Sequence, residues 1–249
     1  MPDQIPNPHG NPTTAPQIGR RGPQSALQSA VLFLRGGIRS DGSRDVEGWD
    51  EWDVAGSEWR LLEGWAASHQ LTPSAEFLPE RPGGREHDVR FDPATNLWYK
   101  FTKPCCAGYT VHVDESGLSM LPATPLEYLE RWNTNNRLFG ELVELVGIQR
   151  TQKGPRIVIS QPHVPGEIST WEEIEETFVG KSRMRRLRIN EPLGGYDAHA
   201  YFKGRIGVFD VRPLNCFHHA VTRELAAIDV IPRTFSRAEA NVLERLVIA

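Results

Sequence analysis

Three polar residues in the C-terminal part of the chain have the types and the spacing that phosphoryl transfer from a nucleotide requires. Asp210 and Asn215 form a D-x-x-x-x-N pattern, and Asp229 follows at the end of a short apolar run. In this chemistry one carboxylate orients the accepting hydroxyl, while an amide oxygen and a second carboxylate hold magnesium. A D-x-x-x-x-N pattern is weakly specific by itself, so its meaning depends on what else the chain supplies.

Groups that could grip a triphosphate occur earlier in the chain. Gly83 and Gly84 precede a strand-like segment and can bring backbone amides close to phosphate, and Lys100 lies in the next strand-like segment. A helix glutamate would hold such a lysine in place, and Glu127 and Glu130 both lie on a predicted helix. Each residue alone is as consistent with a turn or a surface position. Their order along the chain is what favours a nucleotide site.

The segments around Lys100 have a strand pattern. Residues 88–91 and 97–101 flank a turn and predict a β-hairpin, and 109–113 predict a third strand. A helix is expected from Thr124, a good N-cap followed by proline, through about Val146. We expect Gly147 to end this helix.

The rest of the chain alternates short strands and helices. A helix from Ser169 to Phe178 is predicted, with Ser169 and Glu172 as its capping box. The other expected elements are strands at 156–160, 205–209 and 225–228 and a last helix at 241–247. Because no strand–helix–strand repeat is present, the order predicts an α+β fold.

The N-terminal part divides into two segments. Residues 1–47 are rich in proline and glycine and are expected to be a largely disordered tail, with one short helix between Ser25 and Leu34. Residues 48–82 are expected to form a leading helical segment, in which Trp59, Leu62 and Trp65 share one helix face. Residues 83–249 then form the functional domain.

Composition excludes several classes of protein. The net charge of −4 gives no overall positive field for nucleic acid, and the three cysteines are too few for a disulfide framework. No apolar run approaches a membrane span, and the N-terminus lacks the pattern of a signal peptide. We therefore expect a cytoplasmic protein with no membrane partner.

One local feature departs from the acidic balance. The basic run at 181–188 is expected to be a solvent-exposed face, and the alternative is that it binds phosphates. Cys216 with His218 and His219 lacks the spacing of a zinc site, so zinc is not expected there.

Several motifs together resemble the serine/threonine/polynucleotide kinase-like family of phage-type polyvalent proteins. They are Gly83–Val89, Trp98–Pro104, Thr124–Arg131 and Ile159–Pro162, followed by the aspartates and asparagine described above. The resemblance covers about residues 58–235. It implies a minimal protein-kinase-like fold of two lobes, a β-rich N-lobe at about 83–160 and a reduced C-lobe at about 163–249.

The resemblance also implies a role for the N-lobe residues. Lys100 would contact the α- and β-phosphates and pair with Glu130 or Glu127. Residues 159–163 would connect the lobes and meet adenine, which places Gln161 and His163 in the nucleotide site. Gly83 and Gly84 would form the loop over the phosphates.

Glu86 and His87 belong to the same loop and have two interpretations. They could lie over the triphosphate, or they could bond their own loop at the start of the hairpin. In the C-lobe, Asp210 would orient the acceptor hydroxyl, while Asn215 and Asp229 would hold Mg²⁺.

The chain departs from the pattern of eukaryotic protein kinases in two places. Val208-Phe209 replaces the usual His-Arg before the catalytic aspartate, and no Phe-Gly follows Asp229. The segment after Asp229 is too short for a long activation loop and a large helical lobe. Regulation by phosphorylation of such a loop is therefore not expected.

The function expected from the sequence is transfer of the γ-phosphoryl group of Mg–ATP to a hydroxyl of a protein or a polynucleotide. The complete set of Lys100, Asp210, Asn215 and Asp229 favours an active enzyme. Two alternatives stay open: a small-molecule phosphotransferase on a similar scaffold, and a catalytically silent nucleotide-binding or interaction module.

Overall fold

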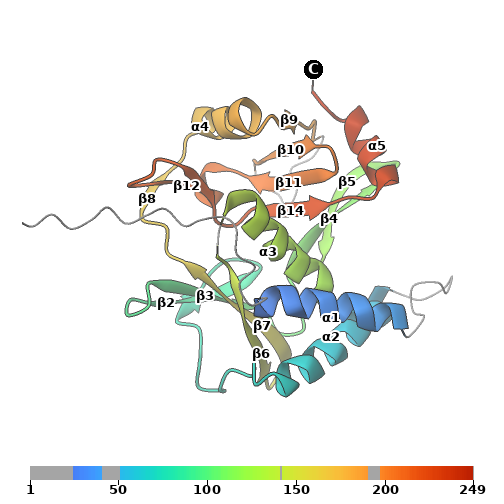
Figure 1. Ribbon diagram of the computed structural model, residues 1–249, viewed down its shortest axis with the longest axis vertical. Coiled ribbons are helices and arrows are strands. Elements are labelled where there is room, and N and C mark those ends of the chain that lie inside the picture. Colours follow the sequence, from blue (N-terminus) through green and yellow to red (C-terminus); the bar gives the residue numbers. More distant parts are fainter. Residues whose placement is uncertain (1–24, 41–50, 141, 190–196, 249) are drawn as a thin grey trace, which may run out of the picture.

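The computed structural model describes residues 25–40, 51–140, 142–189 and 197–248 (Figure 1). The described chain combines helices with antiparallel sheets, which confirms the α+β prediction. The α-helices are α1 (Ala26–Ser40), α2 (Glu51–Ser68), α3 (Pro125–Phe139), α4 (Trp171–Glu175) and α5 (Arg237–Arg245). A π-helical turn (Glu176–Lys181) follows α4, and a 3-10 turn (Pro213–Asn215) follows strand β11.

The strands form four separate sheets among the described residues. A five-stranded sheet has the order β1-β2-β3-β7-β6, formed by Arg81–Pro82, His87–Asp92, Leu97–Thr102, Gly154–Pro162 and Glu144–Thr151. A four-stranded sheet has the order β14-β11-β10-β9, formed by Ile231–Thr234, Ile206–Val211, His199–Lys203 and Arg185–Arg186. Strands β13 (Leu225–Ala227), β12 (Cys216–His219) and β8 (Gly166–Ile168) form a third sheet, and β4 (Tyr109–Asp114) pairs with β5 (Gly117–Pro122).

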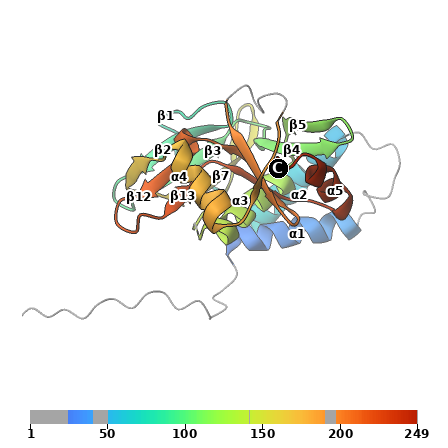
Figure 2. The same cartoon turned by 90° about the horizontal axis from the view of Figure 1, so that it is seen from above.

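Two groups of elements lie on either side of α3 (Figure 1). The five-stranded sheet packs with α1 and α2, while the four-stranded and three-stranded sheets lie with α4 and α5 on the other side. Figure 2 shows the same arrangement from above, with α1 running beneath α3. Helix α3 contacts α1 and β14, so it joins the two groups.

The predicted hairpin is present as β2 and β3. Its register pairs Val89 with Lys100 and Phe91 with Trp98, and the next strand places Ile159 opposite Lys100. Since side chains alternate along a strand, Lys100 and Trp98 point to the same face of the sheet. The hairpin therefore sets which residues accompany the lysine.

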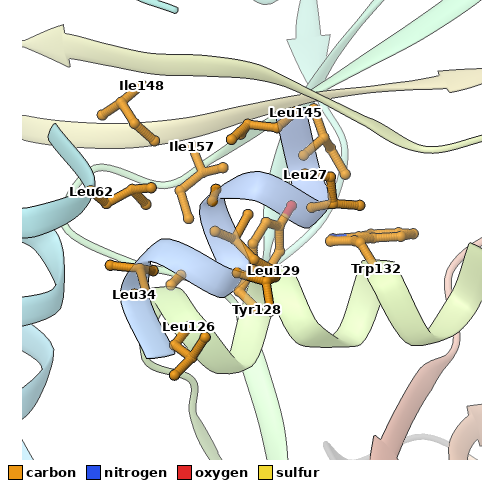
Figure 3. Close-up of a cluster of buried hydrophobic side chains, with 14 of the residues drawn as sticks. Leu27, Leu34, Leu62, Leu126, Tyr128, Leu129, Trp132, Leu145, Ile148 and Ile157 are labelled. Carbon is orange, nitrogen blue, oxygen red and sulfur yellow. The ribbon is translucent and has the colours of Figure 1, made fainter. Parts of the chain in front are cut away.

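The largest core cluster fills the space between α1, α2, α3 and the five-stranded sheet (Figure 3). Leu27 and Leu34 from α1 meet Leu62 from α2 and Trp132 from α3, while Ile157 comes from β7. Burial of this apolar surface holds α3 in place at the centre of the molecule.

Helix α1 lies within the stretch at 1–47, for which the sequence predicts a largely disordered tail with one short helix. Leu27, Ala30, Val31 and Leu34 recur at helical spacing and are 0–2% exposed, so this face is part of the core. The expected short helix between Ser25 and Leu34 is thus present, and it continues to Ser40. The expectation for residues 1–24 lies outside the described residues.

Helix α3 starts as predicted and ends earlier. Thr124 caps it with a complete capping box, and Pro125 occupies the first turn. Gly140 adopts a left-handed conformation at φ 68° and ends the helix at Phe139. The expected helical extension to Val146 is wrong, because the chain after the glycine enters β6.

Helices α4 and α5 begin at other residues than those predicted. Both Ser169-x-x-Glu172 and Thr170-x-x-Glu173 fit the capping-box pattern, and the structure uses Thr170 and Glu173. Ser169 is instead buried, and its backbone N–H donates to the Cys216 carbonyl. Helix α5 begins after the cap Ser236 rather than at 241.

Within the described residues, no helix is both long enough and apolar enough to span a lipid bilayer.

Candidate functional site

Lys100 reaches from β3 to the segment that ends in Asp229. Its Nζ donates to Asp229 Oδ1 at 3.2 Å and to the Ile228 carbonyl oxygen at 2.9 Å. The ammonium also lies 4.8 Å from the centre of the Trp132 ring, within the range of a cation–π contact. The structure therefore brings together two residues that the sequence placed in one site.

A buried arginine of α3, Arg131, completes this ion-pair group. Its Nη1 donates to Glu86 Oε1 at 2.5 Å, its Nη2 lies 3.5 Å from Asp229 Oδ1, and its Nε donates to the Val230 carbonyl at 3.0 Å. The side chain is 3% exposed. Sequence reasoning missed Arg131, because the helical pattern does not show that this charged side chain is buried and needs a partner.

Glu130 and Glu127 do not pair with Lys100, which corrects the sequence expectation. Glu130 Oε1 accepts from Arg35 Nε of α1 at 2.7 Å, and Glu127 accepts from the Thr124 backbone N–H at 3.0 Å in the capping box. The physical reason is the orientation of α3, because the core packing of Trp132 directs Arg131 toward Asp229 and leaves Glu130 facing α1.

The surrounding charges keep Asp229 ionised. Burial by itself would raise its pKa, but Lys100, His87 and Arg131 together lower the pKa below the ordinary value for an aspartate. Asp229 is thus a carboxylate held between two cations.

Glu86 and His87 are anchored inside the protein. His87 is 3% exposed, and its Nε2 lies 2.8 Å from the Tyr128 hydroxyl. Burial lowers the pKa of His87 to about 4, so the ring is neutral at pH 7. Glu86 also accepts from the Tyr109 backbone N–H at 3.2 Å. These contacts favour the interpretation in which Glu86 and His87 bond to protein groups and not to a triphosphate. Their partners lie on α3 and β4, and not only in their own loop.

A glycine makes room for the Glu86 carboxylate. Gly108 has φ 73°, and a Cβ atom at this position would lie 1.8 Å from Glu86 Oε1. Both the left-handed backbone and the close approach therefore require glycine here.

Asp210 and Asn215 form the second part of the site. The Asn215 Nδ2 donates to Asp210 Oδ2 at 2.9 Å and to the Asp210 carbonyl at 2.8 Å. The other carboxylate oxygen, Oδ1, is buried without a hydrogen bond, and Arg212 Nε lies 3.3 Å away in an ion pair. Burial raises the pKa of Asp210 to about 6, against the effect of Arg212, and the charge of Asp229 adds to the increase.

Asp210 is also conformationally unusual. Its φ of 52° is in the left-handed region, which non-glycine residues seldom adopt and which is often found at functional sites. The loop is hydrogen-bonded to the segment that contains Asp229, because the Ile228 N–H donates to the Asn215 carbonyl at 2.9 Å.

A pocket of about 560 Å³ opens beside Lys100. Its lining comes from the five-stranded sheet and the chain after β7 on one side, and from β12 and the chain after β13 on the other. The lining residues are Arg81, Pro82, Gly83, Val89, Trp98, Lys100, Gln161, Pro162, His163, Val164, Phe217 and Ile228. None of these described lining residues is an aspartate or a glutamate. The predicted nucleotide residues Gly83, Lys100, Gln161 and His163 thus meet in one pocket.

Other predicted residues lie outside this lining. Gly84, Glu86 and His87 are not among the described residues that line the pocket. Glu86 and His87 instead lie behind Lys100, where they and Asp229 place possible ligand atoms within 4.8 Å of one another. Asp229 is shared between this group and the ion pairs with Lys100 and Arg131.

The basic run at 181–188 is largely paired with carboxylates. Lys181 pairs with Glu176, Arg185 with Glu244 and Arg186 with Glu175. These ion pairs favour the interpretation of residues 181–188 as a solvent-exposed face over the interpretation as a phosphate-binding segment.

Comparisons of the chain with protein-family models, with curated proteins and with solved structures find no match.

Proposed function

We propose that this protein is an ATP-dependent phosphotransferase that binds Mg–ATP in the pocket beside Lys100 and transfers the γ-phosphoryl group to a hydroxyl. The acceptor that we propose is a protein or a polynucleotide. The five-stranded sheet with its helices would act as the N-lobe and the strands from β8 onward as the C-lobe of a minimal kinase-like arrangement.

One observation carries the proposal: Lys100 links the pocket to Asp229. The pocket supplies glycine and apolar groups without a carboxylate, as a polyanionic nucleotide requires, and Lys100 is its innermost cation. Beyond the lysine lie Asp229, Asn215 and Asp210, which are the carboxylates and the amide that phosphoryl transfer uses.

The same residues fit a magnesium ion. Mg²⁺ is a hard cation that prefers carboxylate and amide oxygens, and the Asn215 amide nitrogen is already turned to Asp210, which leaves its oxygen for another partner. Asp229 and Asn215 would hold the ion, which would neutralise phosphate charge. Asp210 would orient the acceptor hydroxyl through Oδ1, which is buried, accepts no hydrogen bond and lies in an ion pair with Arg212.

A phosphate would compete with Asp229 for Lys100, which lines the pocket, while Arg131 would stay with Glu86. Lys100 and Arg131 are both within 3.5 Å of Asp229 Oδ1. A triphosphate beside Lys100 offers the lysine new partners and frees the carboxylate for the metal. A silent module is the alternative, in which these ion pairs serve stability only.

The decisive experiment measures thermal stability with and without Mg–ATP for the wild type and for Asp229→Asn. Ligand at about 100 times the dissociation constant should add about 2.7 kcal/mol of stability to the wild type. We expect no shift in Asp229→Asn, provided that its circular dichroism shows a folded protein.

Each outcome has a clear meaning. A gain in thermal stability in the wild type alone supports the metal–nucleotide site. The class of acceptor is then tested by measuring transfer of labelled γ-phosphate to casein and to an oligonucleotide. No shift in the wild type would contradict the proposal. Equal shifts in both proteins would remove Asp229 from the site.

A further inference from the structure

Trp98 occupies a particular position in the pocket. It lies two residues before Lys100 on β3, points to the same face of the sheet, and lines the pocket while only half-buried. Two strand positions span about 7 Å, which leaves room for a sugar between a group on Trp98 and a phosphate on Lys100.

A planar group already lies on the indole. The guanidinium of Arg81 is 5.1 Å from the centre of the Trp98 ring, and both residues line the pocket. The ring face is therefore directed toward the pocket and not covered by the core. Because Arg81 is exposed, it can leave this position without loss of buried contacts.

The orientation of the indole is set by its neighbours. Trp98 Nε1 donates to His163 Nδ1 at 3.1 Å, and the Phe91 ring lies 4.8 Å away on the paired strand. His163 thus contributes to the pocket by holding Trp98. An aromatic surface with a fixed orientation can stack a flat ring at low cost in conformational entropy.

We propose that Trp98 is the surface on which the nucleobase stacks, and that the base takes the place of the Arg81 guanidinium. This inference rests on the proposed nucleotide site, and it names the group that recognises the base. Phe217 of β12 and Ile228, which follows β13, line the pocket on the other side and would supply apolar contacts to the ligand.

Stacking on Trp98 predicts a particular selectivity. Every base offers a π-face, so stacking tolerates changes at the base edge, whereas hydrogen-bond recognition does not. We expect ATP and GTP to bind with similar affinity and inorganic tripolyphosphate, which lacks a base, to bind more weakly.

The test compares two probes on three proteins by isothermal calorimetry in the presence of Mg²⁺. The probes are ATP and inorganic tripolyphosphate, and the proteins are wild type, Trp98→Ala and Trp98→Phe. Trp98→Ala should weaken ATP binding by about 5-fold to about 100-fold and leave tripolyphosphate binding unchanged. Trp98→Phe, which keeps a ring, should fall in between.

Tyr99 provides the matched control. It is the next aromatic residue on β3, points to the opposite face and packs edge-on against Phe77 at 4.9 Å. Tyr99→Ala should leave the ratio of the two affinities unchanged.

The outcomes separate this inference from the proposed function. If wild type binds neither ATP nor tripolyphosphate, the nucleotide site itself is wrong. If wild type binds ATP and Trp98→Ala weakens both probes equally, or neither, then Trp98 does not stack the base. Equal loss in Tyr99→Ala and Trp98→Ala would assign the effect to the sheet and overturn the inference.

Discussion

Lys100 Nζ lies 3.2 Å from Asp229 Oδ1, although 129 positions separate the two residues in the chain. The lysine belongs to the five-stranded sheet and the aspartate follows the last strand of the three-stranded sheet. The pair therefore connects the two groups of elements at the point where the pocket ends. Changes at this contact should affect ligand binding and stability together.

Lys100→Met tests this connection. The change removes a cation from the pocket and a partner from Asp229, so we expect loss of Mg–ATP binding and a decrease of about 1–3 kcal/mol in the free energy of unfolding. The estimate is below that of a fully buried pair, because the Asp229 side chain is 36% exposed. Urea denaturation and calorimetry measure the two effects. Lys103→Met, which breaks a pair with Asp88 at the end of the same strand, is the control that should retain binding.

Asp210→Asn should separate binding from transfer. Asp210 is assigned to the acceptor hydroxyl and not to Mg²⁺, and asparagine keeps its size beside Asn215 and Arg212, so the variant should bind Mg–ATP with wild-type affinity. Loss of a group that orients and deprotonates the acceptor should lower the rate of phosphoryl transfer by about 10²–10⁴-fold. Release of labelled phosphate and calorimetry give the two readouts. If binding is lost as well, Asp210 has a structural role instead.

Arg131→Met should be among the most destabilising changes in α3. It breaks the buried pair with Glu86, which costs about 3–5 kcal/mol, and removes one of the two cations beside Asp229. Arg131→Lys should recover only part of this loss, because an ammonium cannot serve both carboxylates and the Val230 carbonyl with the same geometry. The measurement is the urea midpoint. Arg137→Met, on an exposed position of the same helix, should change it little, and an equal effect of the two variants would contradict this account.

His87→Gln should reduce sensitivity to acid. In the folded protein the pKa of His87 is about 4, while in the unfolded chain it is near 6.5, so between these values the unfolded state binds the proton. The stability that neutral His87 contributes is present above pH 6.5 and is lost as the pH falls toward 4, by up to about 3 kcal/mol. Glutamine does not titrate, so the variant should lose less stability than wild type between pH 7 and pH 4.5. Parallel urea curves at the two pH values measure this difference, and equal losses would show that His87 does not carry it.

Much of the local structure follows from local signals. The hairpin around Lys100, the capped start of α3 at Thr124 and the approach of Asn215 to Asp210 depend on residues that are close in sequence. Their turns, caps and side-chain alternation act within a few positions, which is why sequence patterns predict them. The C-terminal end of α3 and the start of α4 differ from the predictions, because two glycines and two capping boxes fit the same patterns.

The partners of the charged residues were decided by tertiary structure. The sequence by itself determined that α3 carries Glu127, Glu130 and Arg131, and that Lys100 lies on a strand. Which of these helix residues faces the site depends on the rotation of α3, and burial of its apolar face against α1, α2 and the sheet sets that rotation. Because this packing energy comes from residues far apart in the chain, only the folded structure directs Arg131 to Asp229 and Glu130 to Arg35.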